Sequence, residues 1–331
     1  MEGSYIIPIY LKETEDREKN IFSNLTGLKL QEKQITVKDV VDTIEKNLQE
    51  IKEKKNNIEV YFLGEYFTKL NLEKQEELLS GVYTYIKEGR ISSIIINTMP
   101  QYISKDILKV LKKYKVKTIN MEIASCNDYL LKRAGYSFSY EDIKKTSKLI
   151  KRYGMNLIYK IFVGLPDATK LDEINTAKTI CKLKPKQVEI YPIKINEKTK
   201  IEEETKNGEY EQLTIVQSIE RAKEITYILT KKKIKVEIMD ETDNEFKRRV
   251  ESGIWFDTIV NKIKKYNVKV KEVEIEVNPQ DFDNALGFEN ENIEKLKEYY
   301  NVDSKVITKE EIKPGKIEII IKKKFTDFLE E

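Results

Sequence analysis

The stretch that decides the fold is residues 91–123, ISSIIINTMPQYISKDILKVLKKYKVKTINMEI. It begins with a short, almost continuously apolar run at 91–97, which is typical of a strand covered on both faces. A helix is predicted at 104–114 and a second strand at 117–123. A strand, a helix and another strand in close succession predict parallel pairing through a right-handed crossover.

The same unit repeats on both sides of this stretch. The predicted strands are 5–11, 58–63, 91–97, 117–123, 156–163 and 187–192, and each is followed by a predicted helix, the last at 212–232. A further strand is predicted at 235–239. An open, doubly wound sheet is the rival architecture, but the sequence contains neither a GxGxxG turn nor a P-loop. The pattern therefore favours an α/β fold, a partial (β/α)6 TIM-like barrel.

The remaining residues predict a small C-terminal α/β domain. We expect a barrel over 1–240, a connecting helix over 241–265 and the small domain over 266–331. Its order of strand, helix, the loop GFEN (287–290), helix and strand resembles a KH domain, whose GxxG loop clamps nucleotide backbones. The second glycine is missing here, and Glu289 and Glu291 would repel phosphate.

Composition excludes several classes of site. The 331 residues include 60 basic and 57 acidic ones, so no global charge draws the chain to nucleic acid or an anionic membrane. The absence of histidine excludes Ser-His-Asp and Cys-His catalysis. Two cysteines, Cys126 and Cys181, are too few for a conventional iron–sulfur cluster. No signal peptide or membrane span is recognisable, so we expect a cytoplasmic protein.

Several segments, taken in order, resemble the radical S-adenosylmethionine (radical SAM) superfamily, above all the branch related to the Elongator catalytic subunit and the coproporphyrinogen-oxidase-like proteins. The segments are IPIY (7–10), NLTG (24–27), FLGEYFTKL (62–70), IIINTMPQYI (94–103), TINMEIAS (118–125), YEDI (140–143), IFVGLP (161–166), VEIYP (188–192) and EFKRRVESGIW (245–255). The resemblance implies the same partial barrel.

The family holds a 4Fe–4S cluster on three cysteines, spaced CxxxCxxC, in the loop after the first strand. The corresponding loop here is residues 12–25, KETEDREKNIFSNL, and Asp16, Asn20 and Ser23 occupy the cysteine positions. Such a set has the wrong softness for iron–sulfur binding. The resemblance therefore implies a degenerate member, a pseudoenzyme. We predict no metal site, no 4Fe–4S cluster and no bound S-adenosylmethionine.

Positions that would contact the cofactor have also changed. The paired glycines of the family are Gly64-Glu65 here, followed by the bulky Tyr66. The ELGVQS-type segment is NMEIAS at 120–125, the family histidine is Phe138, and its glutamine is Lys160. The architectural residues are retained and the cofactor contacts are not.

Side chains at the carboxyl ends of parallel strands meet at one edge of a barrel, where enzymes of this type place their sites. The ligand-binding candidates at these ends are Gly64, Glu65, Asn97, Asn120, Glu122, Lys160 and Tyr191. A lysine between carboxylates can bind a small polar ligand or form an internal ion-pair network, and the sequence leaves both open. No catalytic residue is assigned.

Three functions are compatible with these patterns. The first is a non-radical binding, regulatory or scaffold protein, with an active paralogue or RNA as partner. The second is a repurposed enzyme in which Glu65, Glu122 and Lys160 carry out acid–base chemistry in the old cofactor pocket. The third is RNA or tRNA binding, because the Elongator-like relatives act on tRNA; it would use the lysine clusters at 112–113, 144–145, 231–233 and 322–324.

Overall fold

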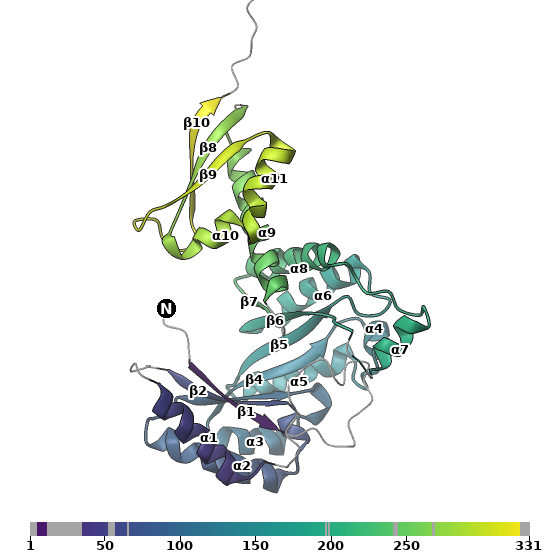
Figure 1. The fold of residues 1–331 in the computed structure, drawn as a ribbon. Helices are drawn as coiled ribbons and strands as arrows, with labels where there is room; N and C mark the ends of the chain where they lie inside the picture. The colour runs from purple at the N-terminus through teal and green to yellow at the C-terminus, as the bar shows by residue number, and fades with distance from the viewer. Residues whose placement is uncertain are drawn as a thin grey trace, which may run out of the picture. The chain divides into compact units, whose positions relative to one another are not determined.

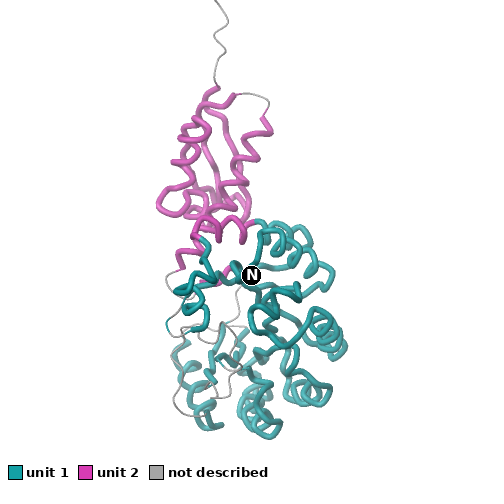
Figure 2. Tube along the Cα trace, turned by 90° about the vertical axis from the view of Figure 1, so that its right-hand side faces the viewer, with its two compact units in different colours: residues 1–213, 224–237 teal, residues 214–223, 238–331 magenta. Residues whose placement is uncertain are grey.

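A computed structural model describes residues 5–11, 35–51, 57–64, 66–195, 197, 199–240, 244–266 and 269–324. The chain divides into two compact units (Figure 2). Unit 1 comprises Met1–Leu213 and Glu224–Glu237, and unit 2 comprises Thr214–Lys223 and Ile238–Glu331. Among the described helices, none combines the length and the apolar character needed to cross a bilayer.

Unit 1 is built on one seven-stranded sheet in the order β1-β2-β3-β4-β5-β6-β7 (Figure 1). The strands are β1 (Tyr5–Leu11), β2 (Ile58–Gly64), β3 (Ser93–Thr98), β4 (Val116–Ala124), β5 (Asn156–Val163), β6 (Gln187–Pro192) and β7 (Lys235–Ile238). Neighbouring strands from β1 to β6 pair in parallel. The sheet curls into an open half-barrel, so the predicted partial barrel is confirmed.

Helices connect these strands, and the longer ones between β1 and β6 cover the outer side of the sheet (Figure 1). They are α1 (Val37–Glu50), α2 (Leu72–Lys87), α3 (Lys105–Lys113), α4 (Asp128–Arg133), α5 (Tyr140–Arg152), α6 (Lys170–Leu183), α7 (Lys200–Lys206) and α8 (Ile215–Thr230), with short 3₁₀ turns at Phe67–Lys69 and Pro100–Tyr102. The sequence prediction did not include α4 or α7. Each has only six or seven residues, too few to show a helical period.

The two faces of the sheet carry different side chains, because successive residues of a strand point to opposite faces. One row of register partners on the outer face is Phe62, Ile96, Ile119 and Leu157. These four side chains have at most 1% exposed surface. Tyr159, on the same face, shares a hydrogen bond of 2.6 Å with Ser147 of α5. The outer face is therefore the apolar core, and the intervening residues line the inside of the half-barrel.

Unit 2 contains a three-stranded sheet in the order β10-β8-β9. Its elements are α9 (Glu245–Ile263), β8 (Val270–Val277), α10 (Phe282–Leu286), α11 (Glu291–Tyr300), β9 (Asp303–Thr308) and β10 (Ile317–Lys324), with 3₁₀ turns at Pro279–Asp281 and Phe288–Asn290. β8 pairs with β9 in parallel and with β10 antiparallel. The expected order of strand, two helices and strand is present, whereas the comparison with a KH domain stays a prediction.

The core of unit 2 includes residues from α9 as well as from the sheet. Ile259 and Val260 of α9 pack with Val273 and Ile275 of β8 and with Leu296 of α11. The helix that we expected as a connector thus contributes to the small core through its last turns.

Candidate polar site inside the half-barrel

The carboxyl-end halves of β3 to β6 bring the predicted polar residues onto the inner face. Asn97 of β3 is the register partner of Asn120 of β4. Two residues further along β4, Glu122 pairs in register with Lys160 of β5, which in turn pairs with Glu189 of β6. The register of these parallel strands therefore places amide, carboxylate and ammonium groups side by side on the inner face.

Hydrogen bonds also join strands that are not neighbours in the sheet. The Asn120 Nδ2 group of β4 donates to the Tyr61 hydroxyl of β2 at 2.7 Å and to Glu189 Oε2 of β6 at 2.8 Å. The Tyr191 hydroxyl donates to the same Glu189 oxygen at 3.2 Å. In filled barrels a layer of inward side chains comes from alternate strands, and β2, β4 and β6 form such a layer here.

Lys160 is held by a carboxylate and two aromatic rings. Its Nζ lies 3.3 Å from Glu122 Oε2, and the other oxygen of Glu122 accepts a hydrogen bond of 2.7 Å from the Tyr136 hydroxyl. The ammonium also lies 4.4 Å from the ring centroid of Tyr191 and 5.1 Å from that of Phe162. These contacts satisfy the cation, as expected for the ion-pair network that the sequence left open.

Burial shifts the acidity of two groups in this layer. It raises the pKa of Glu189 above its ordinary value, although the hydrogen bond from Asn120 and the charge of Lys160 oppose this change. Burial also raises the pKa of Tyr61 well above its ordinary value, and the negative charge of Glu189 adds to the effect. Tyr61 is therefore an uncharged phenol at neutral pH.

Acidic groups outnumber basic ones in this part of the inner face. Glu122, Glu189 and Glu237 all act electrostatically on Tyr61. Lys160 is paired with Glu122, and the exposed Lys235 has its Nζ 3.9 Å from Glu237. The site thus favours a cationic or hydrogen-bond-donating group over an anion.

Two amide oxygens in the site have no hydrogen-bond donor among the described residues, namely Asn97 Oδ1 and Asn120 Oδ1. Both side chains are oriented by their amide nitrogens, because Asn97 Nδ2 donates to the Gly64 carbonyl at 3.2 Å and Asn120 Nδ2 donates to Tyr61 and Glu189. Asn120 is only 4% exposed. A buried acceptor without a donor costs about 1–3 kcal/mol, which a bound donor would recover.

Gly64 has a structural reason to be glycine. Its φ of +89° is unfavourable for other residues, and a Cβ at this position would run into the backbone carbonyl of Leu11 on β1. Glu65 lies outside the described residues. Tyr66 turns towards Tyr102, with 5.9 Å between ring centroids. Phe138, at the family's histidine position, is buried with its ring 5.1 Å from that of Tyr136.

The structure adds residues that the sequence prediction left out. Tyr61, Tyr136 and Glu189 contact the predicted residues Asn120 and Glu122 directly. Glu189 could have been found, because it precedes Tyr191 by two residues and must share its face. Tyr61 alternates in the same way with the buried residues of β2. Tyr136 follows α4, a helix that the sequence does not predict. No sequence pattern indicates that the Tyr136 side chain lies beside Glu122.

The donor set for a 4Fe–4S cluster does not fit. Asp16, Asn20 and Ser23 lie outside the described residues, and none of them supplies a thiolate. Cys126 follows β4, where burial raises its pKa to about 12. Cys181 lies on α6, and burial raises its pKa too. Two cysteines are also fewer than the three thiolates that the family uses for its cluster.

The GFEN loop of unit 2 contains a glycine that is also required by packing. Gly287 has a φ of +89°, and a Cβ there would lie 2.7 Å from the Asn292 side chain. Asn292 Nδ2 donates to the carbonyls of Ser252, Asn284 and Ala285. The glycine thus makes room for a buried asparagine, which explains its presence without a nucleotide.

Comparison with known proteins agrees with this geometry. Residues 31–180 match the family model described as the Radical SAM superfamily. Over that segment, slightly under half of its length, the chain is similar to the radical SAM superfamily. Elp3 of Methanocaldococcus infernus, solved with an N-terminal deletion, shares the fold with a TM-score of 0.57 at 19% sequence identity. That superposition covers 74% of this chain and 57% of Elp3.

Two relatives come from Methanocaldococcus jannaschii. An uncharacterized protein is 27% identical over 158 residues, which make up 46% of this chain and 48% of the relative. A tRNA uridine(34) acetyltransferase is 23% identical over 185 residues, which make up 50% of this chain and 34% of that enzyme. The chain therefore matches less than half the length of either relative.

Proposed function

We propose that this chain is a radical SAM-like protein that has lost the cluster and acts as a cytoplasmic non-radical binding protein. The cluster part of the proposal is supported by the donor set, since the chain has only two cysteines and Asp16, Asn20 and Ser23 stand in the loop after β1. The match to the family model begins at residue 31, after this loop. No step of radical chemistry is assigned to the chain.

The binding part of the proposal rests on one observation. The amide oxygens of Asn97 and Asn120 accept no hydrogen bond from any described residue. They occur on register partners of adjacent strands, beside the carboxylate of Glu189. Two acceptors next to an excess of carboxylates suit a small ligand that carries N–H donors, such as an amine, an amidine or an amide. If the site were purely structural, both oxygens would remain without a hydrogen-bond donor, which lowers the stability of the fold.

The binding proposal is tested on the full-length chain. Protein purified under native conditions is analysed by mass spectrometry for a retained small molecule and by thermal shift against a panel of amines, carboxylic acids and alcohols. We expect amines or amides to stabilise the protein, and we expect Asn97→Leu to weaken this stabilisation. Asn156→Leu is the matched control, because Asn156 starts β5 and its side-chain amide donates to Thr118 rather than to the polar layer of Asn120 and Glu189. No retained or stabilising compound would instead support a scaffold.

The cluster proposal has a separate test. The chain is incubated anaerobically with ferrous iron and sulfide, desalted, and assayed for bound iron and visible absorbance. We expect no stoichiometric iron, whereas about four irons per chain with iron–sulfur absorbance would overturn the proposal. If the chain bound an amine and also took up a cluster, the binding part of the proposal would stand and the cluster part would fall.

A repurposed enzyme is the second candidate, and Glu189 is the observation that favours it. A buried carboxyl with a raised pKa, next to a possible ligand position, is suited to donate or accept a proton. Lys160 is less suited as a base, because it is paired with Glu122 at 3.3 Å. This candidate predicts turnover of a bound ligand that Glu189→Gln abolishes without preventing binding.

RNA binding is the third candidate, and its support is the relative named tRNA uridine(34) acetyltransferase. The lysine clusters predicted to contact RNA are partly neutralised by neighbouring carboxylates. The pairs are Lys113 with Glu76, Lys144 with Glu141 and Lys322 with Glu274. This candidate predicts tRNA binding that weakens steeply with salt.

A further inference from the structure

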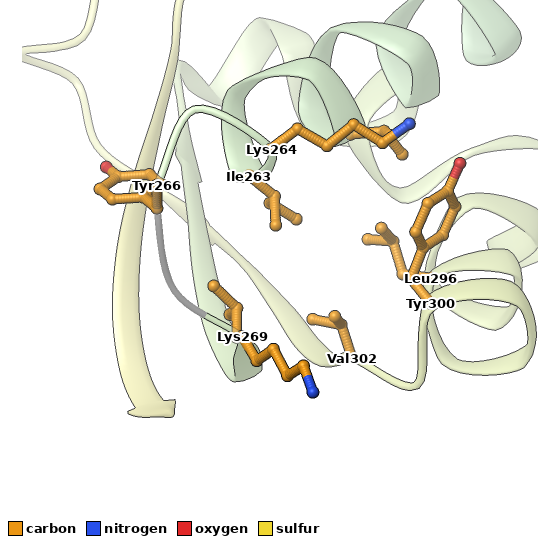
Figure 3. Close-up of a pocket in the computed structure, with 9 residues that line it drawn as sticks. Ile263, Lys264, Tyr266, Lys269, Leu296, Tyr300 and Val302 are labelled. Atoms are coloured by element: carbon orange, nitrogen blue, oxygen red, sulfur yellow. The ribbon is translucent and has the colours of Figure 1, made fainter. Parts of the chain in front are cut away.

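Unit 2 contains a hollow of about 270 Å³ that none of the predicted sites includes (Figure 3). It lies where the end of α9, the start of β8 and the end of α11 meet. Its lining residues are Val260, Ile263, Lys264, Tyr266, Lys269, Val270, Leu296, Tyr300 and Val302. The volume is close to the lower limit of known ligand pockets, about 300 Å³, so the hollow suits a small organic molecule.

The floor of the hollow is aliphatic. Ile263, Leu296 and Val302 point into it from α9, from α11 and from the segment before β9 (Figure 3). Leu296 and Val302 belong to the core of unit 2 and are at most 3% exposed. A floor fixed by core residues is preformed, and it favours the apolar part of a ligand over water.

Aromatic rings form part of the walls. The Tyr266 hydroxyl donates to the Ile319 carbonyl of β10 at 2.9 Å, which fixes this side chain in place. Tyr300 is 41% exposed, and its ring centroid lies 5.4 Å from Lys264 Nζ. Tyrosine rings offer large contact areas at a low entropy cost, so they add to the apolar surface available to a flat or chain-like body.

Two lysines stand on opposite sides of the hollow, Lys264 and Lys269 (Figure 3). Neither has a carboxylate within ion-pair distance in the part of the chain that the structure describes. Other lysines of unit 2 do have such partners, as Lys295 with Glu291, Lys309 with Glu276 and Lys322 with Glu274 show. No described carboxylate therefore pairs with the positive charge at the hollow.

The local sequence strengthens this charge. Residues 261–271, NKIKKYNVKVK, contain lysines and no acidic residue, in a chain whose 60 basic and 57 acidic residues are otherwise nearly balanced. Lys264 is the C-cap of α9, where a cation also compensates the helix dipole. Lys269 precedes β8 and has no helix end of its own, so dipole compensation does not explain it.

We propose that this hollow binds a small amphipathic organic anion, whose apolar body rests on Ile263, Leu296 and Val302 and whose acidic head lies between Lys264 and Lys269. The head is a carboxylate, sulfonate or phosphate, since each of these accepts hydrogen bonds from ammonium groups. The site is independent of the polar site in unit 1, which favours donors and cations. The two units would thus recognise ligands of opposite charge.

The proposal is tested with the fluorescent probe 1-anilinonaphthalene-8-sulfonate on the folded full-length chain. We expect saturable binding of the probe and its displacement by octanoate, weaker displacement by octanol and none by octylammonium. Lys264→Gln combined with Lys269→Gln should weaken probe binding about tenfold or more, because two charged hydrogen-bond donors are lost. Circular dichroism and thermal unfolding establish that each variant is folded.

The matched control is Lys262→Gln combined with Lys265→Gln, which removes the same charge from the same segment but alters no lining residue. This variant should bind the probe as the unaltered chain does. Ile263→Glu, which places a carboxylate at the hollow, should abolish binding. Equal effects of both lysine pairs, displacement by octylammonium, or no saturable binding at all would overturn the proposal. Displacement by an RNA oligonucleotide but not by octanoate would identify a nucleic-acid surface instead.

Discussion

The two faces of the seven-stranded sheet are stabilised by different interactions, although alternate residues of the same strands form them. Outer residues such as Phe62 and Ile96 are packed under helices with no exposed surface. Inner residues such as Asn120 and Lys160 are joined by hydrogen bonds and an ion pair across the half-barrel. The outer face is fixed by burial of apolar area, and the inner face by specific partners, so the two should respond differently to substitution.

The largest effect is expected on the outer face. Phe62→Ala should lower the free energy of unfolding by about 3–5 kcal/mol, because a fully buried ring is removed and a cavity is left behind. Urea unfolding followed by circular dichroism measures this change. A loss below about 1 kcal/mol would show that the outer face is not closely packed around Phe62.

The same contrast explains what the sequence predicted. The strands contain apolar runs such as Ile94-Ile95-Ile96, so the strands, their parallel order and the partial barrel could be predicted from residues 91–123 and their repeats. The inner face depends on register and on contacts between strands that are far apart in sequence. Asn97, Asn120, Glu122, Lys160 and Tyr191 were named because they end strands, and the structure places them on one face.

The hydrogen-bond partners of the inner-face residues are harder to predict from the sequence than the strand positions of these residues. The bond from Asn120 to Glu189 spans 69 residues, and no local pattern specifies it. Tyr136 reaches Glu122 only because the short helix α4 redirects the chain after β4. Glu65 and the loop at 12–25, which the resemblance made central, lie outside the described residues, so the predictions for them stay predictions.

The second effect concerns the ion pair of the inner face. Lys160→Met should destabilise the chain by about 3 kcal/mol, because it leaves the buried Glu122 carboxylate without its cation. Adding Glu122→Gln should restore much of the loss, since the uncompensated charge is then removed. Urea unfolding of the two single variants and the double variant measures the coupling. Additive losses would show that the two side chains do not interact.

The third effect is a pH dependence that only the inner face should show. The pKa of Glu189 is raised in the folded state, so folding favours its protonated form, and this contribution is lost as pH rises through the raised pKa. Glu189→Gln removes the titration, and the variant should gain stability relative to the unaltered chain as the pH rises from the ordinary glutamate pKa through the raised pKa. The gain is about 1.4 kcal/mol for each tenfold difference in proton affinity between folded and unfolded states.

Unfolding curves of both proteins at several pH values check this prediction. Thr118→Val serves as a control on the inner face, because it introduces no change in titratable groups. A difference between Glu189→Gln and the unaltered chain that is constant with pH would contradict the assignment, and so would a difference that changes in the opposite direction.

The smallest effect compares two adjacent aromatic residues that point to opposite faces. Tyr61→Phe removes the hydroxyl that accepts from Asn120, and it should cost about 1 kcal/mol, because Asn120 Nδ2 keeps Glu189 as a partner. Phe62→Tyr, by contrast, forces a hydroxyl into the apolar core and should cost more, about 1–3 kcal/mol. Equal costs for the two changes would mean that the faces differ less in polarity than their contacts indicate. A larger cost for Tyr61→Phe would show instead that its hydroxyl holds the whole layer of β2, β4 and β6 together.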